Sequence, residues 1–221
     1  MKITREQLAG MIDHSLLRPN ATGEELKKLC AEAVEYGFKA VCVNPIHVGE
    51  AAGMLKGQRV LVCSVVGFPF GTHSPKMKAL ETEEVIRLGA REIDMVIRVG
   101  LLLEKRDREV LEDIQAVVKA AQRCPVKVIL ETCYLSREDK IRACQLVIEA
   151  GAFFVKTSTG FAAGGATVDD VRLMRETVGK NFGVKAAGGI RTLDEALKMI
   201  EAGANRLGTS ASVNIIKALT V

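Results

Sequence analysis

Short runs of apolar and β-branched residues recur along the whole chain, separated by segments with a different apolar spacing. Eight such runs occupy residues 12–17, 39–45, 59–69, 92–100, 126–132, 153–159, 183–189 and 206–210. Runs of this length and composition predict buried β-strands. The segments between them place apolar residues three and four positions apart, as at Leu26, Leu29 and Ala33, which predicts helices. The chain is therefore expected to alternate strand and helix eight times.

The borders of the expected helices carry capping signals. A Ser or Thr precedes an acid by three residues at Thr22–Glu25, Ser136–Asp139, Thr167–Asp170 and Thr192–Glu195. Glycines at positions 37, 89, 151 and 203 are expected to end helices before the next strand. Eight strand–helix units in 221 residues predict a single-domain (β/α)8 TIM barrel over residues 1–221. A doubly wound open sheet is the alternative, but it normally needs fewer strands, and no GxGxxG follows the first strand.

Composition narrows the class of protein. Hydrophobic residues make up 48% and charged residues 26%, as in a globular protein with a real core. The 31 basic and 27 acidic residues form no like-charge runs, which argues against a nucleic-acid or membrane-surface partner. No stretch approaches the ~20 apolar residues of a membrane span, and the first residues lack a signal-peptide core. The six cysteines include no CxxC pair, which favours reduced thiols in a cytoplasmic protein over disulfides or a zinc site.

Strand alternation predicts which side chains enter the barrel. The expected inward set is Cys42, Asn44, Glu92, Asp94, Val96, Arg98, Lys127, Ile129, Glu131, Phe154, Lys156, Ser158 and Lys185. Barrel interiors are usually filled by branched aliphatic side chains, so these charges need a reason. A structural ion-pair network explains Lys127 and Glu131 well. It explains Lys156 and Lys185 poorly, because they are expected on neighbouring strands, where two ammonium groups repel each other.

Two buried neighbouring lysines suggest amine chemistry. Burial and a nearby ammonium both disfavour the charged form, so one of the two amines is expected to be neutral near pH 7. A neutral amine attacks a carbonyl to form a Schiff base, whose iminium accepts electrons while a carbon–carbon bond breaks or forms. Asp94 is expected to relay protons through water during these steps.

The last two strands end in glycine-rich turns, "AAGGIRT" and "RLGTSAS". In many barrels the turns after strands 7 and 8 form a phosphate site. Backbone N–H groups of Gly188, Gly189 and Gly208 and the hydroxyl of Ser210 are the candidate ligands. Plain tight turns are the alternative, but two such turns on one rim favour phosphate binding.

Nearly the whole chain carries a series of motifs in a fixed order: "IDHSLLRP", "AVCVNP", "VVGFPFG", "EIDMVI", "KVILET", "FVKTSTGF", "GGATVDDVRLM", "GVKAAGGIRT" and "NRLGTS". With these motifs the sequence resembles the deoxyribose-phosphate aldolases, class I (Schiff-base) enzymes with a (β/α)8 barrel. The resemblance implies reversible cleavage of 2-deoxy-D-ribose 5-phosphate to D-glyceraldehyde 3-phosphate and acetaldehyde. It implies no metal or organic cofactor, a small phosphorylated sugar as substrate, and assembly into a dimer or tetramer.

The resemblance also implies roles for single residues. Lys156 of "KTSTG" corresponds to the lysine that forms the Schiff base, and Lys185 of "VKAAGG" to the one that perturbs it and joins a proton relay. Asp94 of "EIDMV" completes the relay, and Asp13 of "DH" assists. The resemblance also implies that the substrate phosphate is bound by Gly188, Gly189, Gly208 and Ser210.

The chain departs from the family pattern at three places. Arg98 stands where asparagine is usual, and strand parity directs it to the barrel mouth, toward the substrate phosphate or the Asp94–Lys185 pair. Ala211 replaces a second serine, and the chain ends in "ALTV" without the terminal tyrosine of some members. Cys42 is expected to pack in the interior, with sensitivity to aldehydes or oxidants as the alternative. Rival functions are a phosphosugar isomerase or decarboxylase that uses carboxylates, or a phosphosugar sensor without turnover.

Overall fold

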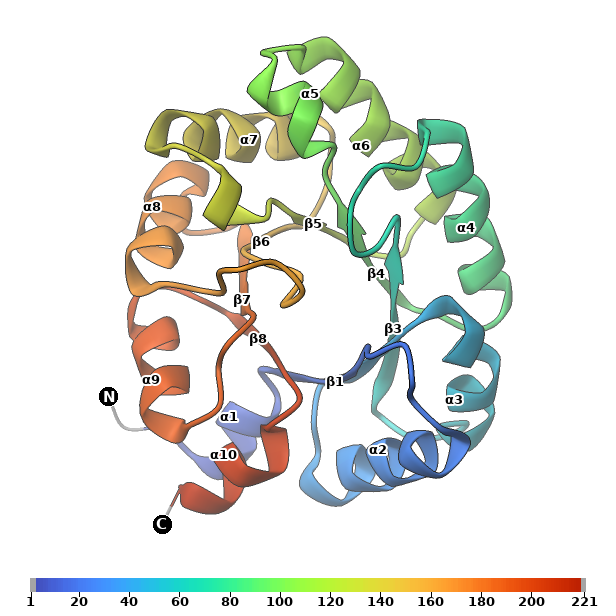
Figure 1. Cartoon of the computed structure of the whole chain (residues 1–221). Helices are drawn as coiled ribbons and strands as arrows, with labels where there is room; N and C mark the ends of the chain where they lie inside the picture. The colour runs from blue at the N-terminus through green and yellow to red at the C-terminus, as the bar shows by residue number, and fades with distance from the viewer. Residues whose placement is uncertain (1–2, 220–221) are drawn as a thin grey trace.

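Eight parallel strands close into one barrel in the computed structural model, which describes residues 3–219 (Figure 1). The strands are β1 (Ile12–Leu16), β2 (Ala40–Val43), β3 (Leu61–Val66), β4 (Glu92–Val96), β5 (Val126–Ile129), β6 (Phe154–Lys156), β7 (Gly183–Ala187) and β8 (Arg206–Thr209). Each strand pairs with its neighbours in sequence, and β8 returns to pair with β1. Closure excludes the doubly wound open sheet, which keeps unpaired edges, and confirms the predicted (β/α)8 barrel.

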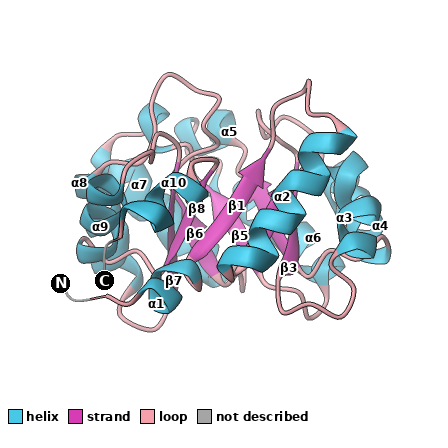
Figure 2. Ribbon diagram, turned by 90° about the horizontal axis from the view of Figure 1, so that it is seen from below, coloured by secondary structure: helices cyan, strands magenta, loops and turns pink. Residues whose placement is uncertain are grey.

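A ring of helices surrounds the barrel of strands. Figure 2, a view turned by 90°, shows the strands enclosed between these helices. The described helices are α1 (Arg5–Ala9), α2 (Gly23–Tyr36), α3 (Val48–Met54), α4 (Pro75–Arg87), α5 (Val99–Leu103), α6 (Asp107–Ala121), α7 (Arg137–Glu149), α8 (Val168–Val178), α9 (Leu193–Glu201) and α10 (Ser212–Ala218). Short 3-10 turns, η1 (Pro45–His47) and η2 (Thr132–Tyr134), follow β2 and β5.

The apolar layer between barrel and helices fixes the orientation of each strand. Ile93 and Met95 of β4 are fully buried in this layer, as are Val110 and Ile114 of α6. Burying side chains of this size stabilises the fold by about 1.5–3 kcal/mol each. A shift of the strand by one residue would move this set to the other face, so the alternative orientation is strongly disfavoured. The intervening Asp94 is therefore directed into the barrel.

Every predicted strand contains an observed strand, but the observed strands are shorter. β4 ends at Val96 and α5 begins at Val99, so the predicted run 92–100 included the start of a helix. After β5, Glu131 adopts a left-handed conformation with φ of 55°, which ends the extended backbone there. The end of a strand depends on where its neighbours stop pairing, which local composition does not encode.

The predicted helix caps are present. Thr22 and Thr192 each form a capping box with the acid three residues on. Ser136 and Thr167 likewise accept a bond from the backbone N–H three residues ahead. Gly37 ends α2 with φ of 70°, a conformation that glycine adopts without the steric cost of a side chain. These local signals set where the chain leaves each helix toward the next strand.

No helix within residues 3–219 is long and apolar enough to cross a membrane. The barrel and its helices run from α1 to α10 as one unit. Residues 1–2 and 220–221 lie outside the described part of the chain. Two predictions therefore lie outside the described residues: the exact ends of the domain at residues 1 and 221, and the absence of a terminal tyrosine.

Candidate active site

A carboxylate at the centre of the barrel binds three lysines. Asp94 Oδ1 accepts a hydrogen bond from Lys127 Nζ at 2.8 Å. Its Oδ2 accepts bonds from the Nζ atoms of Lys156 and Lys185, each at 2.7 Å. The strand register places Asp94 beside Lys127 and Lys156 beside Lys185. The inward orientation predicted for these four residues is confirmed.

A second set of charges lies one layer closer to the amino-terminal ends of the strands. Arg206 donates to Asp13 Oδ1 and to Glu92 Oε2, both at 2.8 Å. Lys127 Nζ lies 2.7 Å from Glu92 Oε2, and Lys185 donates to Asp13 Oδ2. Positive and negative groups therefore alternate through both layers, so that each buried charge has a partner of opposite sign.

Arg206 is a site residue that the motifs did not identify, although a signal was present. Gly208 and Ser210 of the same segment were expected at the rim, and counting back by two puts Arg206 on the inward face. Its guanidinium carbon lies 5.5 Å from the centroid of the Phe154 ring. This contact also confirms the inward orientation predicted for Phe154.

Glu131 does not belong to the ion-pair network. The structural role predicted for Lys127 and Glu131 is correct for Lys127 only. The Glu131 carboxylate instead accepts bonds from the backbone N–H of Thr159, at 3.1 Å, and from its hydroxyl. Glu131 thus ties the chain after β5 to the chain after β6, near the mouth of the barrel.

The charge state of Lys185 differs from the simplest expectation for paired lysines. Burial acts to lower the pKa of Lys185, but the carboxylates of Asp13 and Asp94 outweigh burial and raise this pKa above its usual range. Lys185 is therefore an ammonium ion at neutral pH. Repulsion between Lys156 and Lys185 is relieved because both bind the same Asp94 oxygen.

The carboxylates of the network are held in their ionised forms. Burial acts to raise the pKa of Asp94, but the ammonium groups of Lys127, Lys156 and Lys185 bring it well below its usual range. Asp13 and Glu92 follow the same rule, because nearby cations outweigh burial and lower the pKa of each. Asp94 is therefore an anion throughout the neutral range.

These shifts predict acid sensitivity of the fold. A group whose pKa is lower in the folded state stabilises the fold above its unfolded pKa and loses this effect as pH falls. Unfolded Asp and Glu titrate near pH ~4, so the free energy of unfolding should hold from pH 7 to about 5 and fall below that. Urea unfolding at a series of pH values measures this. Asp94→Asn should lower stability at pH 7 by about 3 kcal/mol and flatten the dependence on acid pH; an unchanged slope would contradict the assignment.

The glycine turns after β7 and β8 line a cavity of about 350 Å³ that reaches Lys156. A side chain at Gly208 would lie 3.0 Å from Lys185 Cε, so this glycine leaves space for the buried lysine. Arg18 and Arg191 also line the cavity, although the motifs did not identify them. The four predicted rim residues all line it: Gly188, Gly189, Gly208 and Ser210. The structure thus brings the predicted phosphate rim and Lys156 to one opening.

Arg98 lies beside this opening and not in it. Arg98 is the residue immediately before α5, and it lines a second cavity of about 530 Å³. The two cavities adjoin at Thr159 and Phe161, which line both. Asp94 receives its side-chain hydrogen bonds from the three lysines and from Cys63. Within the described residues Arg98 thus makes no hydrogen bond or ion pair with Asp94 or Lys185, and its contact with a substrate phosphate stays a prediction.

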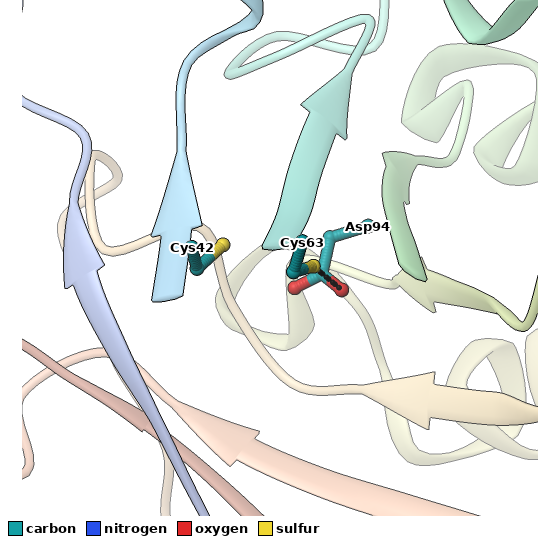
Figure 3. A group of neighbouring side chains, drawn as sticks. All are labelled: Cys42, Cys63 and Asp94. Atoms are coloured by element: carbon teal, nitrogen blue, oxygen red, sulfur yellow. Dashed lines mark hydrogen bonds between the residues drawn. The ribbon is translucent and has the colours of Figure 1, made fainter. Parts of the chain in front are cut away.

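Cys42 lies inside the barrel, as predicted, next to a second cysteine. Cys42 on β2 and Cys63 on β3 are direct partners in the strand register, and both are fully buried. Figure 3 shows their side chains beside Asp94, to whose Oδ1 Cys63 donates at 3.2 Å. The three residues offer metal-ligand atoms within 4.8 Å of one another, but the three ammonium groups already on Asp94 oppose a further cation.

Comparisons with known proteins identify the family of the chain. A model of the family described as "DeoC/LacD family aldolase" matches residues 8–218. A relative from Thermoanaerobacter sp. (strain X514), named deoxyribose-phosphate aldolase, is 55% identical over 213 residues, which cover 95% of this chain and 96% of the relative.

Solved structures show the same similarity. A protein from Coccidioides immitis assigned as a deoxyribose-phosphate aldolase superposes with a TM-score of 0.94 at 44% identity, over 97% of this chain and 86% of that one. The deoxyribose phosphate aldolase from Aeropyrum pernix, described as tetrameric, has a TM-score of 0.92 at 33% identity, over 97% and 92% of the two chains. On the strength of the family match and these relatives, the chain belongs to the DeoC/LacD family of aldolases.

Proposed function

We propose that this protein is a deoxyribose-phosphate aldolase, which cleaves 2-deoxy-D-ribose 5-phosphate reversibly to D-glyceraldehyde 3-phosphate and acetaldehyde. The observation that carries the proposal is the position of Lys156. Its amine bonds to Asp94 inside the barrel, and the same residue lines the cavity bounded by the glycine turns. An amine and an anion-binding rim at one opening suit a substrate with an aldehyde at one end and a phosphate at the other.

Lys156 is the proposed Schiff-base residue. Of the three lysines on Asp94, it is the one that lines the cavity, whereas Lys127 and Lys185 lie among the fully buried side chains. Its amine attacks the substrate carbonyl, and the resulting carbinolamine loses water to give an iminium. The iminium then takes up the electron pair of the breaking carbon–carbon bond while the substrate hydroxyl at that bond loses its proton, and glyceraldehyde 3-phosphate leaves. Protonation and hydrolysis of the remaining enamine release acetaldehyde and restore the free amine. The iminium is a covalent electron sink, so the proposed reaction needs neither a metal nor an organic cofactor.

Asp94 and Lys185 are proposed to handle the protons. Asp94 Oδ2 accepts from both Lys156 and Lys185, so it is one hydrogen bond from the reacting amine. A carboxylate in this position can relay, through water, the proton that the Lys156 amine gives up before attack and the one that is needed when the carbinolamine loses water. Lys185 stays cationic between Asp13 and Asp94, and its positive charge offsets the negative charge of the Asp94 carboxylate. Asp13 holds Lys185 from the other side and so assists indirectly.

The glycine rim is proposed to bind the phosphate. Backbone N–H groups near Gly188, Gly189 and Gly208, together with the Ser210 hydroxyl, are suited to a phosphate because they donate hydrogen bonds without bulky side chains. Arg18 and Arg191 add positive charge to the same cavity. Binding at this end orients the aldehyde toward Lys156.

The proposal is tested by trapping the covalent intermediate. The protein should release glyceraldehyde 3-phosphate from deoxyribose phosphate in a coupled assay. With acetaldehyde and borohydride, an ethyl group should be fixed on Lys156 and appear in a tryptic peptide of residues 143–172, left uncut at the modified lysine. Turnover of a phosphosugar without an adduct would support carboxylate chemistry instead, and binding without turnover would support a sensor.

Assembly and location are proposed on separate grounds. We expect a homo-oligomer, because the Aeropyrum pernix relative is described as tetrameric.

A location in the cytoplasm is proposed from the cysteines. All six cysteines are free thiols, four of them buried, which suits the reducing cytoplasm. There the reaction would serve the breakdown of deoxyribose phosphate.

A further inference from the structure

Cys42 and Cys63 form a pair of thiols inside the barrel that the proposed reaction does not use. They are opposite each other on β2 and β3, and their Sγ atoms lie within 4.8 Å of each other and of an Asp94 oxygen (Figure 3). Neighbouring strands lie about 4.8 Å apart, which falls within the ~4.4–6.8 Å range of Cα separations that a disulfide bridges. The spacing of the two strands is therefore compatible with a disulfide between them.

The pair is connected to the proton-handling groups. Cys63 Sγ donates to Asp94 Oδ1 at 3.2 Å and accepts a bond from Lys127 Nζ at 3.4 Å. Asp94 in turn binds Lys156 through its other oxygen. Any change at the Cys63 sulfur therefore alters the hydrogen bonds of the carboxylate beside the reacting amine.

We propose that Cys42 and Cys63 are an oxidation site, at which a peroxide converts the two thiols to an intramolecular disulfide that slows turnover. Hydrogen peroxide is close to water in size, and the cavity reaches Lys156, whose amine binds Asp94. Cys42 and Cys63 lie beside the same Asp94, so the proposed route of a peroxide passes Lys156, as that of the aldehyde does.

The two sulfurs have different parts in the reaction. The neighbouring Cys63 side chain lowers the pKa of the Cys42 thiol, and the ammonium groups of Lys185 and Lys156 act in the same direction against burial. Burial raises the pKa of the Cys63 thiol well above its usual range. The thiolate is the reactive form, so Cys42 is the sulfur that attacks peroxide and Cys63 the one that completes the bond.

The chemistry balances with peroxide as the only oxidant. The Cys42 thiolate attacks one peroxide oxygen, the O–O bond breaks, and the hydroxide released takes up a proton to leave as water. Cys63 then attacks the sulfenic sulfur of Cys42, and the hydroxyl leaves with the Cys63 proton as a second water. Two thiols have lost two electrons to one peroxide. The Cys63 S–H that donated to Asp94 no longer exists, so Asp94 Oδ1 loses that bond.

The test is peroxide treatment of the whole enzyme followed by peptide mapping without reductant. We expect a cross-link between tryptic peptides 40–56 and 60–76, with a loss of two hydrogen atoms. The extent of cross-linking should follow the loss of activity. We expect kcat to fall about tenfold or more, because positioned acid–base groups contribute ~10²–10⁴-fold to such rates. Dithiothreitol should reverse both changes, and bound substrate should slow both.

Variants identify the sulfurs. Cys42→Ser and Cys63→Ser should each eliminate the cross-link, and with it the dithiothreitol-reversible part of the inactivation, measured against each variant's own untreated activity. Two control variants alter cysteines that are not fully buried, Cys124→Ser and Cys133→Ser. Both should respond to peroxide as the wild type does. A cross-link between other cysteines, or inactivation that leaves peptides 40–56 and 60–76 unlinked, would overturn the proposal.

The effect on turnover rests on the proposed function, but the disulfide is detected by mass alone. A cross-link in a protein without aldolase activity would leave the oxidation site standing and refute the proposed reaction. Active enzyme that resists the cross-link would do the opposite. The two proposals therefore fail separately.

Discussion

Replacement of Lys156 by alanine is expected to lower kcat for deoxyribose phosphate cleavage by about 10⁴-fold or more, as removal of a covalent nucleophile commonly does. Without the amine no iminium forms, and the electron pair of the breaking bond has no acceptor. The coupled release of glyceraldehyde 3-phosphate measures the rate. The borohydride adduct of acetaldehyde should vanish with it. An adduct that persists in Lys156→Ala would assign the Schiff base to another lysine.

A matched pair of conservative changes separates amine chemistry from electrostatics. Lys156→Arg keeps a positive charge that can bond to Asp94, but a guanidinium does not form a Schiff base under these conditions. It should be as inactive as the alanine variant. The control is the same change at Lys140 of α7, whose Nζ bonds to Asp170 of α8 at 2.6 Å. Lys140→Arg should leave kcat unchanged. Substantial activity in Lys156→Arg would mean that only the charge matters, which would refute the covalent mechanism.

Replacement of Lys185 by methionine is expected to damage both turnover and stability. The change leaves Asp13 and Asp94 buried with one cation fewer, and loss of one partner from a buried ion pair costs about 3–5 kcal/mol. We expect the urea midpoint at pH 7 to fall accordingly. Turnover should fall by about 10²–10⁴-fold, because the proton relay loses a member. With less positive charge nearby, the pKa of Asp94 rises, so the acidic limit of activity should move to higher pH.

The pH profile distinguishes a relay from a purely structural role. Lys198→Met removes an exposed lysine that is paired with Asp194, and it should change neither the urea midpoint nor the pH profile. If Lys185→Met lowered stability but kept the wild-type kcat and pH limits under conditions where it is folded, Lys185 would be a structural residue only.

Much of the fold and the centre of the site follow from local patterns. An alternation of two residues determined which side chains of each strand meet the helices, because a strand has to bury its apolar set. That rule placed Asp94, Lys156 and Lys185 inside the barrel before any contact was known. The glycine turns after the last two strands followed in the same way from their positions along the chain. These features depend on neighbours in sequence, so the sequence contains them.

Partnerships between distant residues were decided by the closed barrel alone. Arg206 meets Asp13, 193 positions away, only because β8 returns to β1. The same closure places Lys185 between two carboxylates, which keeps it cationic and reverses the expectation that it repels Lys156. Strand parity did not decide which cavity Arg98 lines, because β4 stops two residues earlier and parity has no meaning beyond the end of a strand. Sequence determined which charges enter the barrel, whereas tertiary structure determined which opposite charge each one meets, because pairing depends on distances that local periodicity does not contain.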